Sequence, residues 1–240
     1  SPFDVGAIWP LQWGLQSAYR TADNVWISNF FVCTEMCGMG TFAHEFGHNL
    51  GVPDLYDTDM SSQGVGCWSI MSSGNYLTYN NQINPAHFDA WSKVKLGWVE
   101  PVELDLTQVA RYTLTPVESG GEILKFTIVD REGDSDEAIY VEYRDSSSAL
   151  FDRGLPGDGL LIWHVDESIE TNEDENHPLV RLVQADGNRD LQLSRNNGDR
   201  FDVWTSGMVL SNQSDPHLLT YDGSDPGIRI AIESMSDGEI

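Results

Sequence analysis

Basic side chains and long apolar runs are scarce in this sequence. Its 240 residues include 13 Lys and Arg against 38 Asp and Glu, which gives a formal net charge of −25. Nucleic acids and anionic membranes bind clustered cations, so this surplus of carboxylates disfavours both as partners. No run approaches the roughly 18 apolar residues of a membrane-spanning helix, and the start, SPFDVGAIWP, has no signal-peptide pattern. We therefore expect no nucleic-acid partner, no membrane insertion and a secreted protein whose export signal has been removed.

Cysteine is also rare, and the three in the chain are Cys33, Cys37 and Cys67. A structural zinc ribbon requires four ligands in paired Cys-x2-Cys spacings, and the sequence has no such spacing. In an exported protein we expect one disulfide and one leftover thiol. The sequence leaves two pairings open, Cys33 with Cys37 or Cys37 with Cys67.

Apolar residues make up 40% of the chain and aromatic residues 10%, which is enough for a hydrophobic core. Residues 1–100 hold 9 Asp and Glu against 3 Lys and Arg, whereas residues 101–240 hold 29 against 10. This change in composition predicts a boundary near Pro101. We expect two parts, residues 1–100 and residues 101–240, with the second packed on the first.

The second part consists of separated apolar runs bounded by Gly, Asp, Asn or Pro, a pattern typical of β-strands. The expected strands are Tyr112–Leu114, Ile123–Val129, Ala138–Tyr143, Leu160–Val165, Leu179–Val183 and Ile228–Ile232. The first part instead carries a helical pattern around residue 44. We therefore predict an α+β fold whose second part is mainly antiparallel β-structure.

The helical pattern contains the motif HEFGHNLGVPD over residues 44–54. At about 100° per residue, His44, Glu45 and His48 share one face of the helix. Imidazoles at i and i+4 suit two positions of a tetrahedral zinc ion, and the carboxylate between them can act on a water without binding the metal. The other face is apolar, and we expect it to be buried in the core. Its members are Met39, Phe42, Ala43, Phe46 and Leu50.

The residues after the helix favour a metal site over a chance pair of surface histidines. Gly51 tolerates a positive φ and can end the helix, which turns the chain back towards the histidines. Asp54 then falls where a third ligand is needed, and Asp57 and Asp59 are competing candidates. We predict a zinc site formed by His44, His48 and Asp54, with Glu45 as the general base.

The segment GCWSIMSSG places Met71 in a tight turn of small residues. After an HExxH helix, such a turn resembles the Met-turn of metzincin peptidases, a hydrophobic floor beneath the metal ligands. The runs HEFGHNLGVPDLYDTD, WSIMSSGNY and PAHFDAWSKVKLGWVEP together resemble the immune inhibitor A family of secreted bacterial zinc metallopeptidases. The likeness covers residues 8–105, and GLLIWHVDE and HPLVRLVQADG extend it into the second part.

This resemblance implies a metzincin-like catalytic part over residues 1–100 and a secreted zinc endopeptidase that acts on proteins or peptides. It implies that a zinc-bound water, activated by Glu45, attacks the peptide bond. Metzincins often place a Tyr two residues after the Met, but that position is Ser73 here. We therefore consider Tyr76 and Tyr79 as alternative groups that stabilise the transition state.

The sheet that precedes the active-site helix in metzincins is predicted to be incomplete here. His44 is preceded by 43 residues, enough for about two strands at common strand lengths. Asn24–Cys33 has strand character and is the expected edge strand for pairing with an extended substrate. Two alternatives are open: the upstream sheet is truncated in this sequence, or a separate N-terminal segment, released by proteolytic processing, completes it.

Acidic loops in the second part predict structural calcium, because calcium takes hard oxygen ligands in loops. The candidate ligands are Asp166, Glu167, Asn172, Asp174, Asp186, Asp190, Asp199 and Asp202. The alternative is a solvated acidic surface, since no EF-hand pattern is present. We expect His164 to be a satisfied core histidine, and we assign no role to His87, His177 or His217.

Two other functional classes remain open from the sequence. The chain could be a metal-stabilised adhesion or binding module that retains the helix without turnover. It could also be a non-peptide amide hydrolase such as a deformylase, which shares HExxH. A deformylase normally uses a cysteine ligand and lacks the Gly51 and Asp54 continuation.

Overall fold

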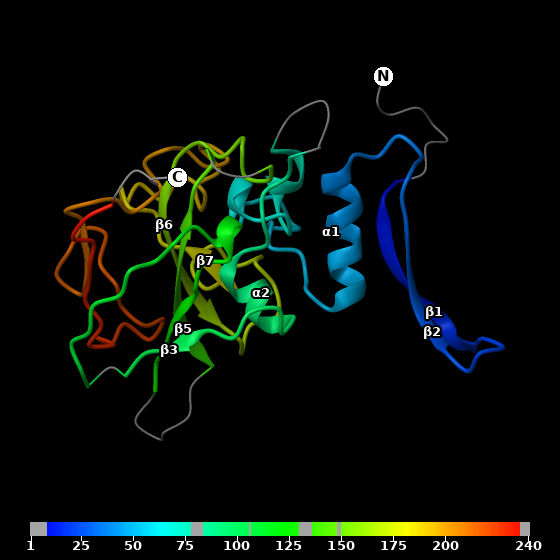
Figure 1. The fold of residues 1–240 in the computed structure, drawn as a ribbon, viewed down its shortest axis with the longest axis horizontal. Helices are drawn as coiled ribbons and strands as arrows, with labels where there is room; N and C mark the ends of the chain where they lie inside the picture. The colour runs from blue at the N-terminus through cyan, green and yellow to red at the C-terminus, as the bar shows by residue number, and fades with distance from the viewer. Residues whose placement is uncertain (1–8, 78–83, 106, 130–135, 148–149, 236–240) are drawn as a thin grey trace.

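A computed structural model describes residues 9–77, 84–105, 107–129, 136–147 and 150–235. Its main sheet lies on one side of helix α1 (Met39–Leu50), and the hairpin of β1 (Leu11–Arg20) and β2 (Trp26–Val32) lies on the other side (Figure 1). The mixture of helices and mostly antiparallel sheets confirms the α+β class. The remaining elements are η1 (Gly66–Trp68), η2 (Ser73–Tyr76), α2 (Ala90–Lys95), β3 (Val102–Glu103), η3 (Val117–Ser119), β4 (Leu124–Thr127), β5 (Glu137–Arg144), β6 (Gly159–Asp166), β7 (Val180–Leu182), β8 (Val209–Leu210) and β9 (Ile230–Ala231).

The main sheet has the order β3-β4-β5-β6-β7, and all its pairs are antiparallel except β3 with β4. Five of the six strands expected after residue 100 are present, with bounds shifted by a few residues. The expected strand Tyr112–Leu114 is wrong, because this segment has no strand. Tyr112 is exposed there, so alternating apolar residues alone did not create a pairing partner.

Alternating residues of β5 and β6 separate two hydrophobic clusters, as the period of a strand requires. Tyr140 and Trp163 belong to one cluster, and Ile139 and Ile162 belong to the other. The first cluster also contains Trp68 from the segment that follows α1. Side chains from both sides of residue 100 therefore share one core, while the boundary near Pro101 stays a prediction.

His164 is a satisfied core histidine, as expected. Its Nε2 lies 2.5 Å from Glu137, and its Nδ1 accepts a hydrogen bond from Arg181 at 2.8 Å. His177, to which the sequence analysis assigned no role, also has a partner, because its Nε2 lies 2.6 Å from Asp166. Both imidazole rings stack on Tyr221, which ties the C-terminal segment to the sheet.

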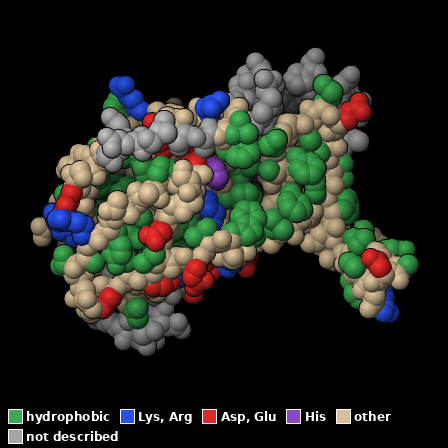
Figure 2. All heavy atoms as spheres, in the orientation of Figure 1, with side chains coloured by type: hydrophobic (Ala, Val, Ile, Leu, Met, Phe, Trp, Pro, Cys, Tyr) green, Lys and Arg blue, Asp and Glu red, His purple; other side chains and the backbone are tan. Residues whose placement is uncertain are grey.

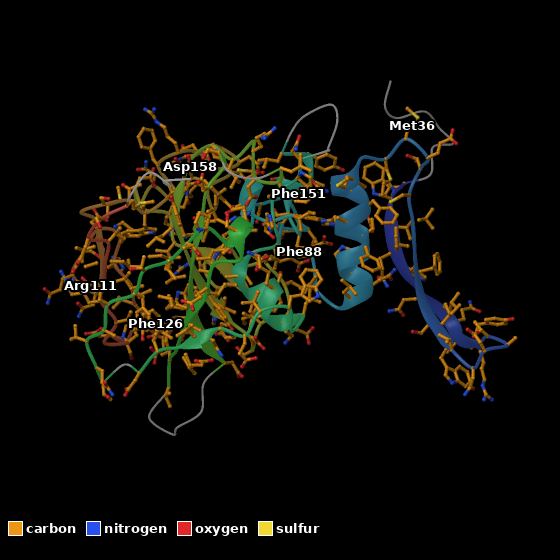
Figure 3. All side chains as sticks on the ribbon, viewed as in Figure 1. Met36, Phe88, Arg111, Phe126, Phe151 and Asp158 are labelled. Carbon is orange, nitrogen blue, oxygen red and sulfur yellow. The ribbon has the colours of Figure 1, made fainter. Side chains whose placement is uncertain are left out.

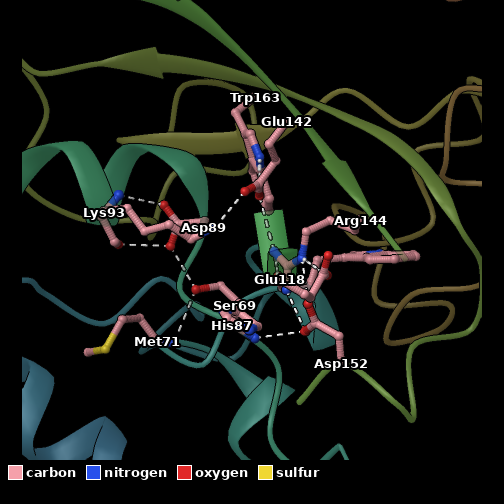
Figure 4. A network of polar contacts seen from close by, with 12 residues as sticks. Ser69, Met71, His87, Asp89, Lys93, Glu118, Glu142, Arg144, Asp152 and Trp163 are labelled. Carbon is pink, nitrogen blue, oxygen red and sulfur yellow. Dashed lines mark hydrogen bonds and ion pairs between the residues drawn. The ribbon is translucent and has the colours of Figure 1, made fainter. Parts of the chain in front are cut away.

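A buried ionic network lies between the main sheet and the segment that follows α1 (Figure 4). Glu142 accepts hydrogen bonds from Lys93 at 2.7 Å and from Arg144 at 3.1 Å. Asp152 binds the Arg144 guanidinium through both oxygens, at 2.6 and 2.7 Å. Because each of these charges is buried, removing one member would leave its partner uncompensated, which is strongly destabilising.

Glu118 differs from the other carboxylates of this network, because it interacts with a second carboxylate, Asp152, as well as with Arg144. Its Oε2 is buried and receives no hydrogen bond. Burial raises the pKa of Glu118 to about 8, and the hydrogen bond with Asp152 adds to the rise. At neutral pH, Glu118 is therefore largely protonated and can donate to the Asp152 carboxylate.

We predict that this proton makes stability depend on pH. The folded pKa of Glu118 lies above the unfolded value, so its stabilising effect is complete below about pH 4.5 and is lost as pH rises through about 8. Glu118→Gln retains a donor towards Asp152 that does not titrate. Melting temperatures measured between about pH 5 and pH 9 should fall less steeply for this variant than for the unmodified protein. Superimposable pH profiles would show that Glu118 titrates normally.

Candidate metal centre

Helix α1 ends where the sequence predicts. Gly51 has a φ of 109°, a left-handed conformation that favours glycine. Its N–H donates to the carbonyls of Gly47 and His48 at 3.1 Å, which closes the last turn. The chain then reverses, and Asp54 returns towards the histidines of the helix.

Two glycines let α1 lie directly against the rest of the protein. A Cβ on Gly40 would overlap the backbone carbonyl of Asn75. A Cβ on Gly47 would lie 2.6 Å from Sδ of Met71 and 3.1 Å from the Phe88 ring. Phe88 is seen beside α1, between the helix and the main sheet (Figure 3). Met71, which is completely buried, therefore lies beneath the helix where a Met-turn residue is expected.

The orientation of α1 is the reverse of the sequence-based expectation. His44 and Glu45 are only 6% and 7% exposed, whereas Met39, Phe42, Phe46 and Leu50 are between 41% and 50% exposed. Most of the apolar face is thus not buried in the core, and of its expected members Ala43 alone packs against the core, where it is partly buried. The apolar face is directed towards the β1–β2 hairpin, where Phe31 contacts Phe42 and Phe46, and two strands are too few to cover it.

Three ligand atoms converge at the inner face of α1. Nε2 of His44 lies 3.0 Å from Oδ1 of Asp54, Nε2 of His48 lies 3.2 Å from the same oxygen, and the two nitrogens are 3.2 Å apart. Ligands about 2.0–2.1 Å from a tetrahedral zinc ion are separated by about 3.3 Å. The spacing of the three atoms therefore fits three corners of such a site.

The hydrogen bonds around the ligands leave these atoms free for a metal. Nδ1 of His44 donates to the Ile70 carbonyl at 2.8 Å, and Nδ1 of His48 donates to the Val52 carbonyl at 2.9 Å. With the proton on Nδ1, each Nε2 keeps its lone pair for coordination. Oδ1 of Asp54 is buried and accepts no hydrogen bond. An unsatisfied buried oxygen is costly, and a cation at this point would satisfy it.

Electrostatics distinguish the two carboxylates of the site. Burial alone would raise the pKa of Asp54, but the adjacent His44 and His48 rings hold it well below its usual range. Burial raises the pKa of Glu45, and the two histidines only partly oppose this rise. Asp54 is therefore suited to stay ionised as a ligand, whereas Glu45 is a more basic carboxylate beside it.

The other candidates for this site lie outside the ligand group. Asp57 accepts hydrogen bonds from Ser61 and Ser62 at 2.8 Å and thereby closes a loop. Asp59 accepts one from the Ser61 N–H at 2.9 Å. Tyr79 lies outside the described residues, and Tyr76 is half exposed.

Sequence reasoning missed Tyr56. Its ring stacks on that of His44 with centroids 6.2 Å apart and an interplanar angle of 20°. Its hydroxyl lies close enough to the Asp54 carboxylate to interact with it. The available signal was its position two residues after Asp54, because alternate residues of an extended segment face the same side.

The calcium hypothesis finds no support. Among the described residues, His44, His48 and Asp54 form the one group of three or more His, Cys, Asp or Glu side chains placed to hold a metal ion. The acidic candidates instead bind neighbouring groups. Asp166 binds Ser168 and His177; Asp174, Asp186 and Asp199 each accept from a backbone N–H two residues later; Asp190 binds Arg195; Asp202 binds Trp68 and Gln184; Glu167 binds Trp91 and Lys95; and Asn172 binds Leu55 and Val180.

Cys33, Cys37 and Cys67 are free thiols in this structure. The Cys33 and Cys37 side chains are hydrogen-bonded to each other at the corner between β2 and α1. Cys67 is buried beside Gly198 and Trp68. A disulfide stays a prediction, and the local pair is the one whose thiols are already in contact.

Known proteins resemble this chain in the segment that builds the site. Residues 12–99 match the family model of the immune inhibitor A peptidase M6 catalytic domain. The pre-pro-metalloprotease PrtV of Vibrio cholerae serotype O1 is 37% identical over 78 residues, which are 29% of this chain and 8% of that protein. Immune inhibitor A of Bacillus thuringiensis subsp. alesti is 37% identical over 75 residues, 28% of this chain and 11% of the relative. The resemblance to the immune inhibitor A family is therefore confirmed.

We predict that replacing His48 by Ala abolishes stoichiometric zinc binding. The change removes one of three protein ligands, and a structural or catalytic zinc site rarely keeps its affinity with two. Elemental analysis after dialysis against a metal-free buffer measures the bound zinc. His217→Ala is the control, because His217 lies outside the ligand group. Full zinc retention by the His48 variant would contradict the assignment.

Proposed function

Because residues 12–99 resemble the catalytic domain of immune inhibitor A peptidases, we propose that this chain carries a secreted zinc-dependent endopeptidase that hydrolyses peptide bonds. The observation that carries the proposal is the convergence of His44, His48 and Asp54 beside a buried Glu45. Two imidazoles, a carboxylate and an adjacent second carboxylate are the groups that metal-assisted peptide hydrolysis requires.

When bound, zinc supplies Lewis acidity, which makes water more acidic and a carbonyl more electrophilic. Glu45 is not one of the three ligand groups, so its carboxylate is available for proton transfer. It accepts the proton of the attacking water and then delivers it to the nitrogen of the leaving amine. The raised pKa of Glu45 suits a base that must also act as an acid. No covalent intermediate with the protein is required.

The third ligand favours a peptidase over a deformylase-like amide hydrolase. The group that converges with His44 and His48 is the carboxylate of Asp54, and none of the three cysteines belongs to the group. The remaining alternative is a binding module that holds zinc without turnover. Glu45 favours catalysis, because a purely structural zinc site has no use for a buried carboxylate that does not bind the metal.

We propose that β2 guides the substrate. It matches most of the expected edge strand Asn24–Cys33, and within the described residues the β1–β2 sheet has no further strand. An extended peptide can pair with a free strand edge through its backbone, which gives affinity without demanding a particular side chain. Protein or peptide substrates follow from this arrangement and from the family resemblance.

We also propose that further polypeptide covers the hairpin and the outer face of α1. Figure 2 shows apolar side chains gathered on the face that contains these elements. Trp13, Tyr19 and Trp26 are more than 60% exposed on the hairpin. Exposed apolar area of this extent indicates a surface that is covered in the working protein, and additional strands paired with the hairpin would cover it.

Secretion is likewise a proposal, and it rests on the family resemblance. No described helix has the length and apolar character needed to cross a bilayer.

We predict that Glu45→Gln keeps the zinc and loses proteolysis. The amide has nearly the same shape but cannot accept the proton of water, and general-base catalysis contributes about 10²- to 10⁴-fold in rate. Casein hydrolysis and bound zinc should be measured on the same preparation. Glu122→Gln, a change at an exposed carboxylate outside the site, is the matched control. Proteolysis at the unmodified rate by the Glu45 variant would rule out this mechanism.

We predict that a longer protein with residues upstream of Ser1 binds less of an apolar fluorescent dye than residues 1–240 alone. Strands paired with the hairpin would remove its aromatic side chains from solvent. The same extension should raise casein turnover, because a complete sheet fixes the substrate-binding strand. Equal dye binding by the two proteins would show that the hairpin stays uncovered.

A further inference from the structure

We propose that Tyr56 is a positioning residue that fixes two of the three metal ligands, His44 through its ring and Asp54 through its hydroxyl. The inference depends on the zinc site of the proposed function, and it adds a residue that neither the HExxH motif nor the Met-turn contains. It concerns how the ligands are held before a metal binds. It therefore makes predictions about metal affinity as well as catalysis.

The backbone on the N-terminal side of Tyr56 is held by three separate segments. Leu55, which is completely buried, donates its N–H to the Met71 carbonyl at 2.8 Å. Its own carbonyl accepts from the Val65 N–H at 3.0 Å and from the Asn172 side chain at 2.9 Å. Leu55 is thus fixed by Met71, by Val65 in the loop that follows Tyr56, and by Asn172 of the β-rich part.

Gly64 supports Tyr56 from the opposite side. Its φ is 56°, a Cβ on it would overlap the Leu55 carbonyl oxygen, and the same Cβ would lie 2.7 Å from the Tyr56 Cα. Any side chain at residue 64 would therefore push this segment away. The close approach restrains the backbone from which the Tyr56 side chain extends.

The Tyr56 side chain reaches two ligands at once. Its ring stacks on the His44 imidazole at a centroid distance of 6.2 Å, and its hydroxyl lies close enough to the Asp54 carboxylate to interact with it. His44 already has a fixed Nδ1 through the Ile70 carbonyl, so the stacking ring restrains the remaining tilt of the imidazole. Asp54 has no such backbone restraint on Oδ1.

This interaction matters because a carboxylate can rotate between several orientations. Oδ1 of Asp54 is aimed at both Nε2 atoms, and a donor on the carboxylate holds that orientation. Partners of this kind, one bond removed from a metal, typically change metal affinity by about 10- to 100-fold.

A second role for Tyr56 would be direct contact with substrate. Tyr56 is 40% exposed, so part of its side chain is accessible to a substrate. A group that only binds substrate or its transition state would alter turnover without altering zinc affinity. The two roles therefore give different results in one experiment.

The test compares Tyr56→Phe with Tyr112→Phe in the zinc-loaded protein. Tyr56→Phe keeps the stacked ring and removes the hydroxyl; Tyr112 is 45% exposed and so offers a matched tyrosine, in a segment without regular structure. Transfer of zinc to a chelating dye gives the dissociation rate and the affinity. We expect zinc binding by Tyr56→Phe to weaken about 10- to 100-fold, and we expect none of this loss in Tyr112→Phe.

The visible spectrum of the cobalt-substituted protein gives a second readout, because it reports the ligand geometry directly. Tyr56→Phe should change this spectrum, and Tyr112→Phe should not. Unchanged zinc affinity and an unchanged cobalt spectrum in Tyr56→Phe would overturn the proposal, even if casein turnover fell. An equal loss of affinity in both variants would also overturn it.

Global unfolding is separated from loss of positioning by the melting temperature of the metal-free proteins. Tyr56→Phe should melt within a few degrees of the unmodified chain, because the ring and its packing are retained and a single polar atom is removed. If the unmodified chain itself binds no zinc, the proposed function fails. If it binds zinc and Tyr56→Phe binds it equally well, only the role of Tyr56 fails.

Discussion

The close contact between helix α1 and the turn that contains Met71 is the constraint on which the candidate metal centre depends. The backbone of Gly47 lies so close to Met71 that no side chain fits between them. This close approach places His44 and His48 within reach of Asp54. The carbonyls of Ile70 and Val52, next to Met71 and next to the helix end, then orient the two imidazoles. A side chain at residue 47 would lift the helix and separate the ligands.

The turn that contains Met71 is held by buried polar and charged side chains (Figure 4). Met71 donates its N–H to Ser69 Oγ at 3.2 Å, and the Ser69 hydroxyl donates to Asp89 at 2.7 Å. Arg144 and Asp152 reach the same segment through the Trp68 carbonyl and the His87 N–H. Residues beyond position 100 thereby support the turn beside the candidate site.

Much of the site could be predicted from sequence because its parts are local. The spacing of His44, His48, Gly51 and Asp54 determines a helix, a turn and a returning ligand within eleven residues. The orientation of α1 could not be predicted from the sequence. An amphipathic pattern shows that the helix has two different faces, but it does not show which part of the protein covers each face. Gly40 and Gly47 allow the histidine face to pack closely against Asn75 and Met71. These contacts join residues far apart in the sequence, so no local pattern contains them. The acidic loops misled for the same reason, because their carboxylates close turns and bind neighbouring donors.

The central claim is that these residues form a working zinc peptidase centre, and one preparation of the unmodified protein tests it most directly. Bound zinc and casein turnover should be measured together, before and after removal of the metal and again after zinc is restored. The account predicts one zinc per chain, with turnover lost on removal and regained on restoration. One zinc per chain with no turnover, in a protein long enough to cover the hairpin, would contradict it and leave a metal-stabilised binding module.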